Sequence, residues 1–269
     1  MTAAGDGVTA LAPVSDELAA LGPFFAVEFH EAGSLASPWQ QMSSLTDFPC
    51  SPDVPDVPDL LDALAERVAA VRAFLASGTA QKTSAVELRV AASVVHLGLV
   101  ARVLSPLLAL AVLHQRYGSV HAADLRWQPT LGSMFPLSVR ASALAADGAT
   151  FADGVLAAGV VGEFGTAIAR FGVNEHIVRG NVASALAGAG KTLAAARPDL
   201  RADIQALIDE LLAGPELAGS GGFQPDGAFR RRSCCLIYRA APTPTPTGNR
   251  DGALCGDCVL APEHGPMEI

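Results

Sequence analysis

Residues 90–113 read VAASVVHLGLVARVLSPLLALAVL and form the most apolar stretch of this 269-residue chain. The run is interrupted by His96, Arg102 and Pro106. A helix that crosses a bilayer needs about 20 predominantly apolar residues, and these three interruptions argue against such a span. We therefore expect this stretch to form a buried core helix, and we expect the chain to have no transmembrane segment.

The residues around this stretch predict where its helix begins, bends and ends. Ser84 and Glu87 have the spacing of a capping box, in which each side chain binds a free backbone N–H of the first turn. Pro106 lacks a backbone donor and its ring clashes with the preceding turn, so we expect it to kink or divide the helix. The second half should end at Gly118, because glycine is favoured just beyond a helix.

Helices and short strands are predicted on both sides of this central segment. Apolar residues spaced three and four apart predict a helix over residues 58–78. Asn174 is a suitable cap for a helix over residues 175–197, and a last helix follows it. Alternating or aromatic-rich patterns predict strands within residues 24–30, 120–127 and 134–140, the last two forming a hairpin. The expected fold class is therefore α+β and mainly α-helical, a helical body with a small antiparallel β element and a cysteine-rich tail.

A glycine-rich stretch divides the chain in two. Residues 215–227 contain GSGG and have the composition of a flexible connector. We expect a mainly helical body at residues 1–215, with short N-terminal and central strands, and a cluster-binding tail at residues 216–269.

Composition and charge limit the classes of partner. Half of the residues are hydrophobic, which is ample for a buried core, and the net charge is −9. That charge argues against a nucleic-acid partner, while peripheral contact with a membrane remains open. The first basic residue is Arg67, so no secretory signal with a positive start is visible. We expect a cytoplasmic protein whose thiols stay reduced.

Four of the five cysteines crowd into one short segment. Cys50 stands alone, whereas Cys234, Cys235, Cys255 and Cys258 lie within 25 residues. The C-x-x-C spacing of the last two lets both thiolates bind one metal atom. Adjacent side chains on a straight strand point to opposite faces. The first two can therefore share a centre only if the chain turns sharply or the centre has two metal atoms.

The residues alone leave two kinds of metal centre open. A [2Fe–2S] cluster has two irons and takes four thiolates. Arg230, Arg231, Arg232 and Arg239 would offset its negative charge, although such a run of charges also suits a solvated loop. A structural zinc site fits two thiolate pairs separated by a loop, but zinc pairs usually have spacer residues between the cysteines. A set of disulfides is disfavoured in a reducing compartment.

The tail also resembles a known family. Residues 231–238 read RRSCCLIY and residues 254–258 read LCGDC, which is similar to the carboxy-terminal signature of FhuF-like ferric-siderophore reductases. A weaker likeness lies at residues 179–184, RGNVAS. The 19 residues between the two cysteine pairs are about twice the usual family spacing, and the cost of closing such a loop grows only slowly with its length.

The resemblance implies a cofactor, a reaction and partners. It implies that Cys234, Cys235, Cys255 and Cys258 bind a [2Fe–2S] cluster. The protein would then pass one electron to the Fe(III) of a ferric siderophore, so that Fe(II) is released. Because the sequence shows no nicotinamide or flavin motif, the electrons would come from a ferredoxin or a reductase protein.

A docking surface for the chelate is predicted only in outline. The candidates beside the cysteines are Arg230, Arg231 and Arg232. Those in the helical body are Arg126, Trp127, Arg179 and Asn181. The rival hypothesis is a non-enzymatic domain in which a four-cysteine zinc site only holds the tail folded.

Overall fold

The computed structural model describes residues 6–33, 35–47, 62–132, 134–145, 148–240 and 254–261. Cys50 and residues 241–253, most of the loop between the two cysteine pairs, lie outside the described residues. The first four residues of the predicted helix at 58–78 do so as well.

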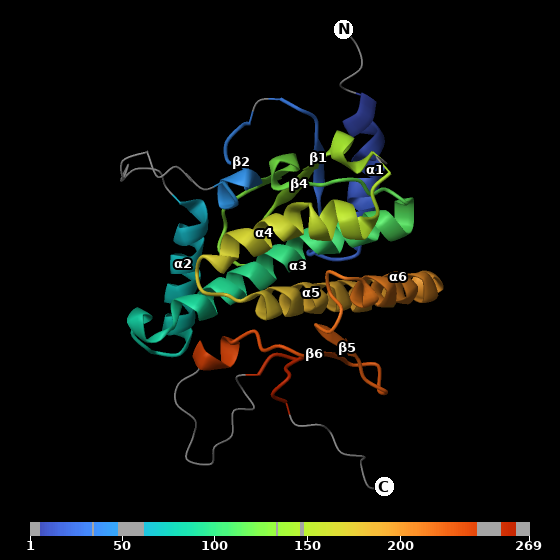
Figure 1. Ribbon diagram of the computed structural model, residues 1–269. Coiled ribbons are helices and arrows are strands. Elements are labelled where there is room, and N and C mark those ends of the chain that lie inside the picture. The colour runs from blue at the N-terminus through green and yellow to red at the C-terminus, as the bar shows by residue number, and fades with distance from the viewer. Residues whose placement is uncertain are drawn as a thin grey trace.

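The described residues form a mainly helical fold with a small sheet, which confirms the predicted fold class (Figure 1). The helices are α1 (Asp6–Ala20), α2 (Ala63–Gly78), α3 (Leu88–His114), α4 (Val160–Ala169), α5 (Glu175–Ala196) and α6 (Arg201–Ala213). The strands are β1 (Glu28–His30), β2 (Gln40–Gln41), β3 (Leu125–Trp127), β4 (Leu137–Arg140), β5 (Gly221–Phe223) and β6 (Phe229–Arg231).

Helix α3 is the centre of the core, and its ends differ from the prediction. It packs against α2, α4 and α5. It begins at Leu88 after a separate 3₁₀ turn that contains Ser84, so the helix does not start at the predicted capping box. It ends at His114, where Gln115 takes a left-handed φ of 51°, before the predicted stop at Gly118.

Pro106 does not divide α3, so of the predicted kink or division the division is wrong. The residues on both sides of Pro106 are buried, as is the proline itself. Burying a leucine side chain contributes about 1.5–3 kcal/mol, and several leucines flank this position. Packing therefore outweighs the one backbone hydrogen bond that a proline removes.

Within the described residues, two helical segments are long and apolar enough to cross a membrane by length and composition alone. They are α3 and the stretch at residues 152–169, which comprises a π-helical segment and α4. In α3, 78% of the apolar window is buried inside the protein, as expected for a core helix, and in the second stretch 50% is buried. The predicted absence of a transmembrane segment stays a prediction.

The sheet is mixed rather than wholly antiparallel. Its strand order is β1-β4-β3-β2, and the predicted hairpin of β3 and β4 is confirmed. β1 pairs with β4 in parallel. Helices α2 and α3 lie between these two strands in the sequence, and such a long crossover connection is what parallel pairing requires.

Arg102 links α3 to the sheet region. Its side chain is buried and donates hydrogen bonds to the backbone carbonyls of Phe135, Phe24 and Ala26. Burial lowers the pKa of Arg102 to about 10, so the guanidinium is still charged at neutral pH.

The cysteine tail lies on the other side of the helices. In Figure 1 the sheet and α1 lie above α3 and α4, whereas the β5–β6 hairpin lies below α5, which it contacts. The hairpin occupies the stretch that was expected to be a flexible connector. Helix α5 therefore provides the surface on which the first cysteine pair is placed.

Candidate metal centre

The β5–β6 hairpin fixes the point from which the first cysteine pair follows. Phe223 lies opposite Phe229, and their rings meet edge to face with centroids 5.5 Å apart. Gly227 in the turn has a φ of +80°, a conformation that glycine adopts without strain. Cys234 and Cys235 therefore follow an ordered strand end.

The chain turns sharply directly after Cys234 and Cys235. Leu236 has a φ of 68°, in the left-handed region, which costs a non-glycine residue about 1–2 kcal/mol. Its N–H donates to Cys234 Sγ over 3.3 Å. Leu236 packs against a small buried cluster formed by Ala76, Val86, Val90 and Ala240. A sharp turn, which is one of the two conditions under which adjacent cysteines can share a centre, therefore follows the pair.

The second cysteine pair forms a compact turn of its own. The N–H of Cys258 donates to the carbonyl of Cys255 over 3.1 Å. The N–H of Leu260 donates to Cys258 Sγ over 3.4 Å. Each pair thus has one sulfur that accepts a backbone N–H from two residues further on. Hydrogen bonds of this kind stabilise a thiolate and orient it as a metal ligand.

One sulfur from each pair meets the other. Cys235 Sγ and Cys255 Sγ lie 3.5 Å apart. Two thiolates that bind one metal at about 2.3 Å with tetrahedral angles are separated by about 3.8 Å. Cys235 and Cys258 are buried, whereas Cys234 and Cys255 are partly exposed, and all four are free thiols. The spacing of Cys235 and Cys255 therefore suits two ligands of a single metal atom.

Among the described residues, no three His, Cys, Asp or Glu side chains gather closely enough to hold a metal ion. The site consists of the close Cys235–Cys255 pair flanked by Cys234 and Cys258. A binuclear cluster takes two thiolates on each metal atom rather than four on one. The donor set fits such a group in kind, because it has four free thiols, two of which accept backbone N–H groups.

The thiols of Cys235 and Cys255 are shifted in pKa in opposite directions. The hydrogen bond with Cys255 lowers the pKa of Cys235 to about 6, against the effect of burial and with help from the charge of Arg231. The same hydrogen bond and burial raise the pKa of Cys255. Burial raises the pKa of Cys234, and the charges of Cys235 and Cys258 raise it further. Charge on Cys235 therefore acts on both Cys234 and Cys255.

Arg231 joins the two cysteine segments to each other. Its side chain is only 1% exposed. Nη2 donates to Cys255 Sγ over 2.8 Å and to Asp257 Oδ1 over 3.0 Å. The Arg231 backbone N–H also donates to the carbonyl of Asp257. Burial acts to lower the pKa of Arg231, but the charges of Asp257, Cys235 and Cys255 outweigh it and the net pKa is raised.

The network continues from Arg231 into the helical core. Arg231 Nη1 donates to Asn181 Oδ1 over 2.9 Å. Asn181 Nδ2 in turn donates to the carbonyl of Ser93 and lies 3.3 Å from His96 Nδ1. Burial lowers the pKa of His96 to about 4. A continuous buried polar chain thus runs from a cysteine of the site to helix α3.

Three further contacts hold the tail against the helical body. A Cβ added to Gly180 of α5 would lie 2.0 Å from Ser233 Oγ, so only glycine allows this close approach without a shift. The carbonyl of Ala240 accepts a hydrogen bond from Gln81. Arg239 pairs with Glu87 at the start of α3 over 2.7 Å.

The predicted docking arginines have different environments. Arg230 Nη1 donates to the carbonyl of Ala261, and Arg231 is buried in the network described above. Arg232 is exposed and borders a cavity of about 190 Å³. That cavity is also lined by His176 and by Ser233, which directly precedes Cys234 in the sequence. Arg232 is thus the arginine of the three that faces solvent beside the cysteines.

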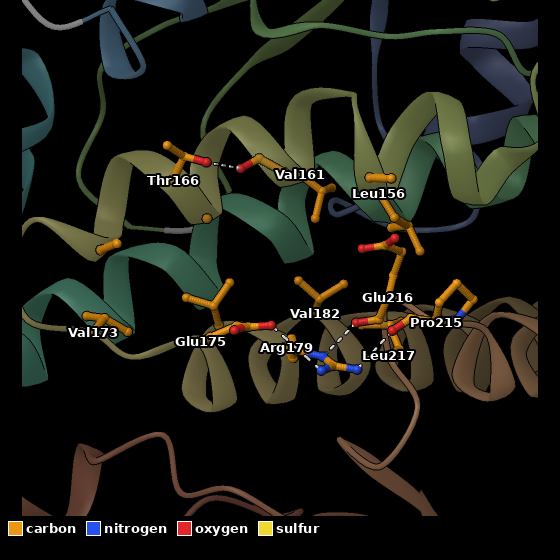
Figure 2. Close-up of a pocket in the computed structure, with 15 residues that line it drawn as sticks. Leu156, Val161, Thr166, Val173, Glu175, Arg179, Val182, Pro215, Glu216 and Leu217 are labelled. Carbon is orange, nitrogen blue, oxygen red and sulfur yellow. Dashed lines mark hydrogen bonds and ion pairs between the residues drawn. The ribbon is translucent and has the colours of Figure 1, made fainter. Parts of the chain in front are cut away.

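Arg179 anchors the connection between α6 and the tail. Its guanidinium donates to the carbonyls of Pro215, Glu216 and Ala218. Figure 2 shows it turned toward that backbone, on the α5 side of a second cavity of about 410 Å³. This cavity lies between α4, α5 and the chain at residues 215–217, and valines line much of it.

Trp127 is not brought together with the cysteines. It lies on β3, is 2% exposed and meets Phe135 edge to face. The guanidinium of Arg67 lies 5.1 Å from its ring centroid. Figure 1 shows the helices α3, α4 and α5 between the sheet and the tail.

Gly180 and Asp257 were not predicted as site residues, whereas Asn181 was predicted as a docking candidate. Gly180, Asn181 and Asp257 contact the segment that carries the cysteines or its arginine. Asp257 stands inside the C-x-x-C pair, and the other two stand in the RGNVAS stretch, so their positions offered a signal. Their contacts with Ser233 and Arg231 depend on how α5 meets the hairpin.

Comparison with known proteins leaves the family open. No protein-family model matches the chain. A search of curated proteins gives no significant match either. The likeness to FhuF-like reductases therefore stays a resemblance of motifs.

Proposed function

We propose that this chain is a cytoplasmic iron–sulfur reductase that passes one electron to siderophore-bound Fe(III), so that Fe(II) is released. The observation that carries the proposal is the contact between two distant cysteine pairs, at Cys235 and Cys255, with Arg231 against it. Cys234, Cys235, Cys255 and Cys258 would hold a [2Fe–2S] cluster. The motif likeness to FhuF-like reductases supports this choice of cofactor and substrate.

The reaction transfers one electron for each iron released. When bound, such a cluster supplies one-electron transfer at a potential set by its surroundings. Hard oxygen ligands of a siderophore hold Fe(III) far more tightly than Fe(II), so one electron weakens the chelate. The electron would come from a ferredoxin or a reductase protein, which is oxidised as the ferric ion is reduced.

The chain's own residues would shape this site in two ways. Burial of Cys235 and Cys258 keeps water from two ligands, and the N–H groups of Leu236 and Leu260 stabilise thiolates. The partly exposed Cys234 directly follows Ser233, which lines the 190 Å³ cavity. We place the docking of the chelate at this cavity, with Arg232 and His176 as polar contacts.

The first experiment asks whether the cluster exists. Protein purified without air should be red-brown, contain iron and acid-labile sulfide, and lose its visible absorption with dithionite. Cys258→Ser and Cys235→Ser should lose or alter the colour, whereas Cys50→Ser removes a thiol outside the four and should keep it. Colourless protein that contains zinc would instead support the structural zinc site, in which the thiolates only hold the tail folded.

The second experiment asks whether the substrate is reduced. Reduced protein is mixed with ferric hydroxamates and ferric catecholates, and Fe(II) is trapped as it forms. We expect electron transfer to at least one chelate, with a raised KM for Arg232→Ala and an unchanged KM for Arg201→Ala, which removes an exposed arginine on α6. A red-brown protein that reduces none of these chelates would refute the reductase proposal.

A further inference from the structure

We infer that Arg231 is a positioning residue that raises the reduction potential of a cluster held by the four cysteines, and that Asp257 acts on the same potential in the opposite direction. This inference rests on the proposed function, because it requires the cluster. It goes further in naming a residue that controls how easily the site takes up an electron.

The positive charge of Arg231 is buried and in contact with a cysteine of the site. The guanidinium is 1% exposed, and Nη2 is 2.8 Å from Cys255 Sγ. Water therefore screens this charge far less than it screens the charge of a surface arginine. In the part of the chain that the structure describes, Nε of Arg231 has no hydrogen-bond partner. Much of the guanidinium's interaction is thus directed at the sulfur and at Asp257.

Reduction would change the charge of the group that the cysteines hold. Taking up one electron adds one negative charge to the group that the thiolates hold. A fixed positive charge in contact with one ligand stabilises the more negative state more than the less negative one. Arg231 should therefore raise the potential, and its removal should lower it. Asp257 partly neutralises Arg231, since its Oδ1 lies 3.0 Å from Nη2. Removing the carboxylate charge should therefore raise the potential.

The effect of the Arg231 charge can be distinguished from the effect of Arg231 on packing. Arg231 also holds Asn181 and the backbone of Asp257, so a purely structural role is the natural rival. Loss of packing alone would disturb the site in a direction unrelated to the sign of the removed charge. Opposite shifts from removing a cation and an anion that touch each other would not follow from disorder.

The experiment measures reduction potentials of the intact, anaerobically purified protein by spectroelectrochemical titration at one pH. Arg231→Gln should lower the equilibrium constant for reduction by about tenfold, which for one electron is about 59 mV. Asp257→Asn should shift it the other way. Arg231→Lys keeps the charge and should recover more than half of the loss. Arg232→Gln removes the neighbouring exposed charge and should change the constant less than twofold.

Each outcome has a distinct meaning. A wild-type protein without iron and sulfide refutes the proposed function itself. A wild-type protein with a cluster, but with Arg231→Gln within twofold of it, overturns the inference alone. The inference is also overturned if Asp257→Asn shifts the potential in the same direction as Arg231→Gln. If Arg231→Gln fails to retain iron, the other two variants test the inference. Asp257→Asn should then raise the reduction potential, and Arg231→Lys should have a potential close to that of the wild type.

Discussion

A buried arginine lies on each side of the helices, and the two bind different kinds of partner. Arg102, on the sheet side, donates only to backbone carbonyl oxygens. Arg231, on the tail side, donates to the side chains of Asn181, Cys255 and Asp257. The two arginines are equally buried, at 2% and 1% exposed. Their partners, rather than their burial, therefore separate their roles.

The difference shows how one residue type can serve either fold or chemistry. Backbone carbonyls keep the same charge throughout any reaction, so Arg102 can act only by holding segments together. A thiol and a carboxylate carry charges that change with protonation, metal binding or reduction. Arg231 is therefore coupled to the state of the cysteines in a way that Arg102 is not.

The largest effect on stability is expected on the sheet side. Arg102→Met would leave three carbonyls without their donor, and each buried acceptor left unpaired costs about 1–3 kcal/mol. We expect the free energy of unfolding to fall by about 3–5 kcal/mol, measured by urea denaturation at neutral pH. Arg201→Met, at an exposed position on α6, should change it by less than about 0.5 kcal/mol. If Arg102→Met lowers the free energy of unfolding by less than about 1 kcal/mol, the structural role assigned to Arg102, and with it the contrast with Arg231, is wrong.

The next effect is a dependence of stability on pH that both sides share. Burial lowers the pKa of His96 to about 4, and burial with the charges of Arg126 and Arg140 does the same for His30. Unfolded histidines titrate near pH 6.5, so as the pH falls the unfolded chain binds protons before the folded one does. This contribution to stability is therefore complete above about pH 6.5 and is lost toward pH 4. The loss is up to about 1.4 kcal/mol per pH unit for the fully buried His96, and it is smaller for the half-buried His30, whose interactions water screens.

Urea denaturation at a series of pH values between 7 and 4 measures this slope. His96→Gln and His30→Gln should each reduce the slope of the free energy of unfolding against pH by the contribution of that histidine. This holds whatever effect the substitution has on stability at pH 7. An unchanged slope in either variant would mean that the histidine is protonated as readily in the folded state as in the unfolded chain.

The smallest effect concerns the contact between the tail and α5. Gly180→Ala should lower the free energy of unfolding by about 1 kcal/mol, because overpacking against Ser233 exceeds the higher helix propensity of alanine. Gly188→Ala, where a Cβ meets nothing within 4 Å, should instead stabilise the protein by about 0.5–1 kcal/mol. Thermal unfolding of the two variants compares them directly.

A double variant tests the cause of that difference. Ser233→Ala removes the oxygen that the new methyl group would meet, so combining it with Gly180→Ala should restore most of the lost stability. If Gly180→Ala stabilises as much as Gly188→Ala, the tail does not press on α5 at this point.

The elements with strong local signals were predictable. Asn174 accepts a hydrogen bond from the N–H of Ile177 and caps α5 as expected, and β3 and β4 form the expected hairpin. α3 was predicted as a core helix, but its predicted ends and the predicted division at Pro106 were wrong. Its boundaries depend on tertiary burial, which overrides the local preferences of Ser84 and Pro106.

Elements whose formation depends on distant partners were missed. Helix α1 lies in an acidic region with a proline inside the helix, and no local pattern favoured it. The β5–β6 hairpin forms from a glycine-rich stretch because Phe223 and Phe229 pack together there. The parallel pairing of β1 with β4 joins residues more than 100 positions apart, which no local pattern specifies.

The candidate site was predictable as a set of cysteines but not as a network. The crowding of the cysteines predicted all four thiols, and the adjacency of Cys234 and Cys235 required either a sharp turn or a centre with two metal atoms. A sharp turn is present at Leu236. The roles of Asn181 and Asp257 follow from the burial of Arg231 against α5. That burial is tertiary information, since a run of three arginines looks the same in sequence whether its middle member is exposed or enclosed.

The left-handed turn at Leu236 has a practical consequence for protein engineering. It is braced by side chains from α2 and from the start of α3, more than 140 residues earlier in the sequence. A short peptide carrying only the two cysteine pairs would lack this brace. The two cysteine pairs alone are therefore not a transferable motif. Grafting them onto another scaffold would also require the helical surface that packs against Leu236.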